Sequence, residues 1–409
     1  MQQNKTIGLL SLPVLVAALG YFVDIYDLLL FGMIRNNSLL SLGLLGDDAI
    51  KTGLKIMSIQ MYGMLIGGII WGVMGDKKGR LSVLFGSIIM YSLANIANGF
   101  VHNVLQYEVC RFIAGIGLAG ELGAGITLVS ELISKEKRGI ATSIVAGVGL
   151  TGAVVAYFIS QSFDWRICFY IGGGLGLLLL LLRVSVFESG MYESLKNKEI
   201  RKGNIFMFFT NGARFKKYLL AILIGLPTWY VIGLLIQVSD KFGKEFGIKE
   251  KIVAGKAVMY AYVAISIADL LIGMVSQVLK SRKKALYIFY AITIVGIVLY
   301  FNQYNGTSTG MYAICALMGF GTGFWALFVT MAAEHFGTNL RATAATTVPN
   351  MVRGSLPLIL LLFGYLQKGM NYSFITSAAI TGAVVMIIST TAVFMTEETF
   401  GKDLDFIEQ

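Results

Sequence analysis

Charged residues are scarce in this chain of 409 residues, since Asp, Glu, Lys and Arg together make up only 14% of it while hydrophobic residues make up 56%. A soluble globule has too little interior for that much apolar surface, so the composition excludes a soluble protein. Proline is also rare, with 4 residues against 48 glycines, which is typical of membrane helices that pack closely through small residues. We therefore expect an all-α protein that crosses a lipid bilayer many times.

Cysteine and histidine are few. The 3 cysteines, Cys110, Cys168 and Cys315, are scattered along the chain, so they indicate neither a disulfide framework nor a metal site. There are only 2 histidines, and no nucleophile-base set or phosphate-binding loop is visible. The sequence therefore predicts a protein that is not an enzyme and uses no cofactor or metal. The net charge of +10 resides in loops between apolar segments, which favours membrane orientation over nucleic-acid binding.

Apolar windows predict twelve membrane-spanning helices. They cover residues 8–34, 54–74, 81–101, 105–130, 139–161, 165–183, 217–238, 254–279, 285–302, 310–332, 342–366 and 373–395. In this arrangement 21 Lys and Arg lie on the side of the N-terminus and 10 on the opposite side, which predicts that both termini are cytoplasmic. We also expect the protein to lie in the inner membrane. We expect four parts: a bundle over 1–183, a cytoplasmic linker over 184–216, a second bundle over 217–395 and a tail over 396–409.

The two halves of the chain share a repeated sequence pattern. Glu131 and Arg138 lie seven residues apart, and the same pair recurs 203 residues later, each time after a Gly-rich apolar segment. The repeated residues are Gly115, Gly117, Glu131 and Arg138 in the first half and Gly319, Gly321, Glu334 and Arg341 in the second. Repeated halves in a membrane protein indicate a transporter whose site lies between the repeats.

Charged residues well inside predicted spans of the first half include Asp24, Asp27, Arg111 and Glu121. The helical rise places Asp27 and Arg111 at depths of about 12 Å and about 9 Å below the outer surface, so these two can meet if their helices are adjacent. Glu121 lies roughly 15 Å deeper than Arg111 and cannot join that contact. A carboxyl group facing a cavity that is wet and dry in turn can carry protons, so we predict proton coupling by this group. The alternative is a permanent ion pair that holds helices together.

Arg353 lies near the middle of the eleventh predicted span, where a guanidinium suits a substrate carboxylate or phosphate. The alternative is that Arg353 pairs with Asp269. Aromatic and amide residues can line the same cavity, although packing is the alternative for each of them. These are Gln60, Tyr62, Trp229, Tyr230, Gln237, Trp325 and Asn350. With a slip of one residue in the repeat, Trp325 occupies the place of Glu121.

After the second span the chain reads Gly72-Val-Met-Gly75-Asp76-Lys-Lys-Gly79-Arg80, which resembles the loop signature of the major facilitator superfamily. The resemblance implies twelve helices in two pseudo-symmetric six-helix bundles. It also implies that charges at the cytoplasmic rim act as latches between helices during gating. We assign this gating role to Gly72, Gly75, Asp76, Gly79, Arg80, Glu131, Arg138, Glu334 and Arg341.

Within that superfamily the motifs are most similar to those of bacterial proton symporters for metabolites and osmolytes. The first span carries Asp24-Ile-Tyr26-Asp27, and the fourth carries Arg111 and then Ala119-Gly120-Glu121, although Leu28 and Ala119 depart from the pattern. The resemblance implies a monomer in the bilayer that takes up a small polar or ionic nutrient, an amino acid or organic acid, together with protons. The alternatives are a drug or siderophore transporter and a transporter-like sensor that does not transport.

Overall fold

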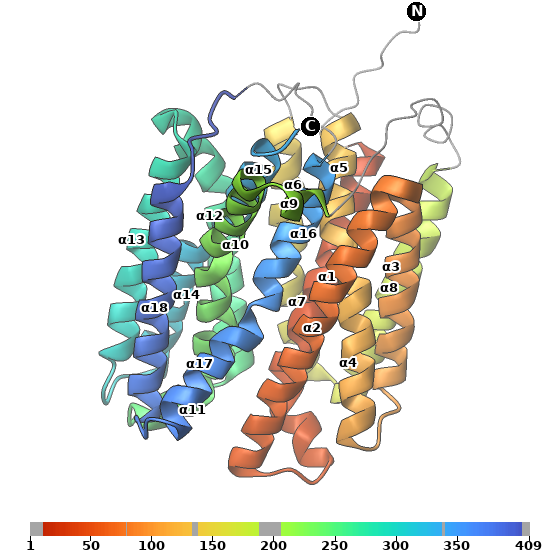
Figure 1. Cartoon of the computed structure of the whole chain (residues 1–409). Helices are drawn as coiled ribbons and strands as arrows, with labels where there is room; N and C mark the ends of the chain where they lie inside the picture. The colour runs from red at the N-terminus through yellow and green to blue at the C-terminus, as the bar shows by residue number, and fades with distance from the viewer. Residues whose placement is uncertain (1–10, 79, 133–137, 188–205, 338–339, 403–409) are drawn as a thin grey trace, which may run out of the picture.

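The protein is described here from a computed structural model, which covers residues 11–78, 80–132, 138–187, 206–337 and 340–402. Within these residues every regular element is a helix (Figure 1). In this part of the chain 11 helical stretches are long and apolar enough to cross a bilayer, and a further apolar helix over Ser82–Asn98 is shorter. The all-α membrane fold expected from the sequence is confirmed.

The first half contains four unbroken spans and two that are broken. The unbroken ones are α1 (Leu12–Ser41), α2 (Gly46–Lys78), α3 (Arg80–Asn98) and α8 (Trp165–Phe187). The fourth span consists of α4 (Val104–Leu118) and α5 (Glu121–Leu132), and the fifth of α6 (Arg138–Leu150) and α7 (Gly152–Ser162).

The second half repeats this pattern. The unbroken spans are α12 (Ala254–Leu279), α13 (Arg282–Phe301) and α18 (Phe374–Met395). Helix α10 (Gly212–Tyr230) continues into the π-helix η1 (Val231–Ile236), and the broken spans are α14 (Ser308–Thr322) with α15 (Trp325–Glu334) and α16 (Arg341–Gly354) with α17 (Leu356–Lys368). Two short helices, α9 (Met207–Thr210) and α11 (Ser239–Glu245), flank α10 and η1. The breaks thus fall in the fourth and fifth spans of both halves.

These breaks correct the sequence prediction, which treated each of the four spans as continuous. Two of them have a clear chemical cause. Pro357 stands in the first turn of α17, where its missing N–H cannot bond back to the preceding helix. At the other, the N–H of Ala326 at the start of α15 donates to Asp269 instead of to a carbonyl of α14.

The repeat seen in the sequence is also a repeat of contacts. Gly115 on α4 faces the backbone of Gln60 on α2, and its counterpart Gly319 on α14 faces the backbone of Ala261 on α12. Gly117 and Gly321 lie against the third span of their own halves, at Tyr91 and Thr293 respectively. Equivalent glycines therefore let equivalent helices approach closely in both halves.

The halves meet along two lines of helices. Helix α2 packs on α16 and α17, and α12 packs on α6 and α7, so in each case the second span of one half meets the fifth span of the other. Helix α1 contacts α12, and α5 contacts α16, nearer the middle of the bundle. The start of α1 and the end of α18 lie at the same end of the bundle, called the near end below, while α11 lies at the far end (Figure 1).

A close contact between helices α2 and α4 generates a stability prediction. A methyl group at Gly63 would overlap the carbonyl oxygen of Phe112, whereas one at Gly174 on α8 would meet open space. We expect Gly63→Ala to destabilise the protein by about 1–3 kcal/mol through overpacking. Gly174→Ala should leave the stability unchanged or raise it by about 0.5–1 kcal/mol, because alanine favours helix. Thermal unfolding of the purified protein in detergent tests this, and equal melting temperatures of the two variants would contradict the packing.

Candidate functional site

Asp27 and Arg111 form a buried ion pair in the middle of the first half. Nη1 of Arg111 lies 2.9 Å from Oδ1 of Asp27, and both side chains are fully buried. The same guanidinium donates to Asn95 at 3.1 Å and to Gln60 at 3.4 Å. The depth argument from the helical rise, which places Asp27 and Arg111 at similar heights, agrees with this contact.

Asp24 pairs with a different arginine, Arg353 of the second half. Nη2 of Arg353 lies 3.6 Å from Oδ2 of Asp24, so the contact joins α1 to α16 across the interface between the halves. The distance is too long for a hydrogen bond. Among the described residues neither oxygen of Asp24, nor Nε and Nη1 of Arg353, has a hydrogen-bond partner.

An aromatic ring completes this open ion pair. The guanidinium carbon of Arg353 lies 5.7 Å from the ring centre of Trp325, within the range of a cation–π contact. Trp325 is the first residue of α15, as Glu121 is the first residue of α5, so the two occupy the same place in the repeat. Arg353 therefore faces a carboxylate of one half and an aromatic ring of the other.

Glu121 pairs with Arg183, the last residue of the sixth predicted span. Both oxygens of Glu121 accept from the Arg183 guanidinium, and both side chains are buried. Helix α8 extends to Phe187, so Arg183 lies inside it. The apolar residues Val184, Val186 and Phe187 that follow Arg183 are the sequence signal that could have shown this. Gly20 on α1 makes room for the pair, since a side chain there would overlap it.

Asp269 does not pair with Arg353 as the alternative reading had it. Its Oδ1 accepts from the N–H of Ala326 at 3.0 Å, in the first turn of α15. Asp269 therefore fixes the start of the helix that carries Trp325. Its other oxygen, Oδ2, is buried and has no hydrogen-bond partner among the described residues.

The predicted amide and aromatic residues lie in several places. Asn350 on α16 donates to the carbonyl of Ala119 at 2.8 Å, so it ties the second half to the break between α4 and α5. Gln237, which directly follows η1, is buried against Gly32 of α1.

Three further predicted residues are less central. Tyr230 donates to Ala378 on α18 at 2.8 Å, and Trp229 is buried beside it on α10. Tyr62 is 42% exposed on an apolar stripe of α2 with Ile66 and Ile70, so it lies apart from the buried polar groups.

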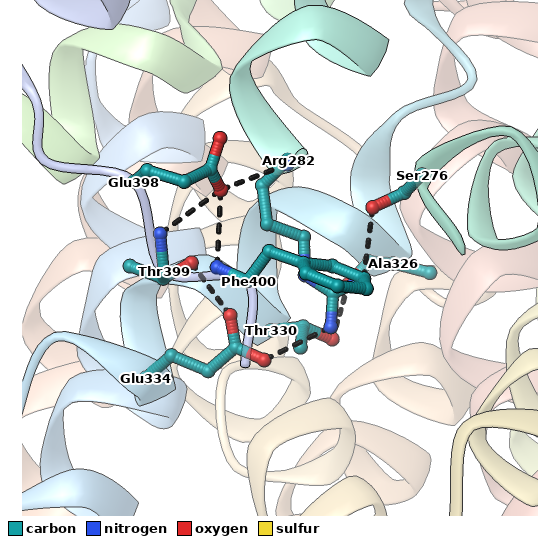
Figure 2. A network of polar contacts seen from close by, with 8 residues as sticks. All are labelled: Ser276, Arg282, Ala326, Thr330, Glu334, Glu398, Thr399 and Phe400. Atoms are coloured by element: carbon teal, nitrogen blue, oxygen red, sulfur yellow. Dashed lines mark hydrogen bonds and ion pairs between the residues drawn. The ribbon is translucent and has the colours of Figure 1, made fainter. Parts of the chain in front are cut away.

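Glu334 belongs to a polar network at the near end of the second half (Figure 2). Its carboxylate accepts from Arg282 at 3.1 Å and from Thr399 at 2.6 Å. The neighbouring Glu398 accepts from Ser281 at 2.5 Å and from four backbone N–H groups, at Arg282, Lys283, Thr399 and Phe400. Burial raises the pKa of Glu398, but these hydrogen bonds lower it further, so that it lies below its ordinary value. The segment after α18 is thus fastened to the loop between α12 and α13.

Of the other predicted gating residues, Gly72 faces Thr347 of α16 across the interface of the halves. The remaining ones lie outside the residues whose side chains the structure describes: Gly75, Asp76, Gly79, Arg80, Glu131, Arg138 and Arg341.

The far end carries ion pairs between the halves that the sequence did not reveal. Arg35, which we had placed in an outer loop, is buried because α1 continues to Ser41. Its guanidinium lies 3.2 Å from Asp240 on α11 and donates to the carbonyl of Gln237 at 3.1 Å. Lys241 on α11 pairs with Asp47 at the start of α2 at 3.0 Å. These contacts fasten α11 to both α1 and α2.

Comparison with known proteins gives relatives over most of the chain. It is 27% identical to the niacin transporter of Acinetobacter baylyi over 99% of this chain and 98% of that protein. It is 25% identical to a putative niacin/nicotinamide transporter of Bacillus subtilis over 85% of this chain and 84% of that protein. A gentisate transporter of Corynebacterium glutamicum is 26% identical over 84% of this chain and 79% of that protein.

A family model covers the same region. The model of the Major Facilitator Superfamily matches residues 17–360, which include every buried ion pair described above. The helix pattern, with two similar halves and a buried polar contact between them, agrees with that match. The chain therefore belongs to the Major Facilitator Superfamily.

Proposed function

We propose that this protein takes up a small carboxylic acid with an aromatic or unsaturated body, together with protons, by alternating access. Membership of a transporter family makes it a secondary transporter rather than an enzyme. The substrate class and the proton coupling are the proposal. We further propose that it acts as a monomer in the inner membrane, with both termini in the cytoplasm.

The open contact between Asp24 and Arg353 carries this proposal. A guanidinium offers parallel N–H donors that match a carboxylate, and Nε and Nη1 of Arg353 have no hydrogen-bond partner among the described residues. The Trp325 ring beside it can stack on a flat substrate. The names of the relatives support the class, since niacin and gentisate are aromatic carboxylic acids.

Competition for Arg353 supplies a mechanism for coupling. Asp24 and a substrate carboxylate would occupy the same side of the guanidinium, so the two anions exclude each other. A proton on Asp24 removes that competition and frees Arg353 for the substrate. By linkage, substrate binding then favours protonation of Asp24 by the same factor. Proton and substrate would therefore bind together and cross together.

The remaining buried pairs have a different role in this proposal. The Arg111 guanidinium already has Asp27, Asn95 and Gln60 as partners, so the pair fixes α1 within the first half. Glu121 and Arg183 satisfy each other in two contacts and hold α5 to α8. Of the carboxylates predicted to couple protons, Asp24 is the one at the interface between the halves.

Uptake into proteoliposomes tests the substrate and its coupling. We expect an inward proton gradient to drive accumulation of radiolabelled nicotinate or gentisate, whereas nicotinamide, which lacks the carboxylate, should not accumulate. Arg353→Gln should lower uptake at least tenfold, because it removes a charged hydrogen bond worth about 1.5–3 kcal/mol. Asp24→Asn should lose gradient-driven accumulation but keep exchange of substrate across the membrane.

The variant Asp48→Asn is the matched control for Asp24→Asn, since it removes the same charge from an exposed side chain outside the buried pair. Uptake that is unchanged in Arg353→Gln would contradict the proposed binding site. Failure of the wild-type protein to move any acid of the panel would overturn the substrate class and favour a drug transporter or a sensor.

A double-mutant cycle tests the structural role of Glu121 and Arg183. Removing one partner leaves a buried charge uncompensated, so Glu121→Gln and Arg183→Met should each destabilise the protein by about 3–5 kcal/mol. The double variant should lose clearly less than the sum, because no buried charge remains. The exposed pair Asp48 and Lys51 serves as control and should show a coupling of about 0.2–0.5 kcal/mol. Additive losses at Glu121 and Arg183 would show that the pair does not act as a unit.

A further inference from the structure

A pocket lies at the near end of the second half, away from the central ion pairs. It is lined by the start of α10, the end of α15, the end of α18 and the segment that follows α18. Its volume of about 220 Å³ is several times the roughly 30 Å³ that one water molecule takes up in the liquid. Lys216, Lys217, His335, Thr396 and Glu397 give it a polar lining.

Two buried polar groups of this pocket lack partners. His335 is only 3% exposed, and among the described residues neither of its ring nitrogens has a hydrogen-bond partner. The hydroxyl of Thr396 is also buried and has no hydrogen-bond partner among the described residues. Burial, with the charges of Lys402 and Lys217, lowers the pKa of His335 to about 4. At neutral pH the ring is therefore uncharged, and one of its nitrogens is an N–H donor.

The charges around the pocket favour an anion. Lys216 and Lys217 bring two ammonium groups from α10, and a third comes from Lys402. Against these stands Glu397, which lies 4.0 Å from Lys217 and 3.5 Å from Lys402. The nearby Glu398 is taken up by Ser281 and the backbone of the α12–α13 loop. The donors thus outnumber the acceptors, as suits the oxygens of a phosphate group.

The surroundings of the pocket are apolar and exposed. Met395 lines the pocket, and the adjacent Phe394 is 76% exposed. On α10, Leu219 is also exposed beside the lining residue Leu220. A soluble phosphate compound has no apolar chains that would cover this surface, whereas the acyl chains of a lipid would cover it.

We propose that this pocket binds the phosphate group of an anionic phospholipid. The ammonium groups of Lys216 and Lys217 hold the phosphate oxygens from the side of α10. His335 and Thr396 donate to it from the opposite wall, and the acyl chains extend over Phe394 and Leu219. The bound lipid links α10, α15 and the segment after α18, so it stabilises the near end of the second half. This site is independent of the substrate and coupling proposed above.

Lipid binding to the delipidated full-length protein tests this. Native mass spectrometry and the melting temperature would be measured with phosphatidylglycerol, with phosphatidylcholine and with inorganic phosphate. We expect phosphatidylglycerol to bind and to raise the melting temperature, and the variant Lys216→Gln/Lys217→Gln to lose at least tenfold in affinity for it. The control Lys280→Gln/Lys284→Gln removes the same charge from exposed residues at the same end and should bind as the wild type does.

His335 gives a second test in case the lysine variant fails to fold. His335→Gln keeps a donor in the pocket and should retain binding, whereas His335→Ala should weaken it. A melting-temperature shift with inorganic phosphate but not with phosphatidylglycerol would overturn the lipid and assign a soluble phosphate compound instead. Equal lipid binding by the wild type and by both the lysine variant and His335→Ala would overturn the site.

Discussion

The structure depends on the pairing of charges that the bilayer would otherwise make costly. Four buried arginines, Arg35, Arg111, Arg183 and Arg353, each contact a carboxylate, and all four contacts involve α1 or lie against it. A lone charge within hydrocarbon costs several kcal/mol, so each pair fixes the position of the helices that supply it. Helix α1 is therefore the element on which the two halves and the far end are aligned.

The pairs differ in how many of the arginine donors have hydrogen-bond partners. This difference distinguishes the pairs that hold helices together from the one that we propose to act in transport. Arg111 is surrounded by three side-chain partners, and Arg183 meets both oxygens of Glu121. Arg353 faces Asp24 at 3.6 Å and keeps donors without partners among the described residues. It also joins the two halves, which must move against each other in alternating access. In the proposed mechanism, the contact that a substrate replaces is thus the one that the movement of the halves breaks.

The sequence predicts the fold and part of the site because some contacts follow from position along a helix. The repeat of Gly115 as Gly319 predicts two similar halves, and the depth of Asp27 predicts that it can contact Arg111. Arg183 was missed because the predicted sixth span ends at it, and Arg35 because two asparagines follow it. The contact of Asp24 with Arg353 depends on the rotation of α1 relative to α16. Neither sequence spacing nor depth fixes such a rotation between helices of different halves.

Equilibrium binding of radiolabelled nicotinate to the purified protein, at acidic and at alkaline pH, is the most direct test of competition at Arg353. The account predicts that the wild type binds more tightly at acidic pH. It predicts that Asp24→Asn binds at least as tightly as the wild type and without dependence on pH, because the competing anion is gone, while Arg353→Gln loses binding. If Asp24→Asn instead loses binding as Arg353→Gln does, Asp24 holds the site together rather than competing with the substrate, and the coupling mechanism is wrong.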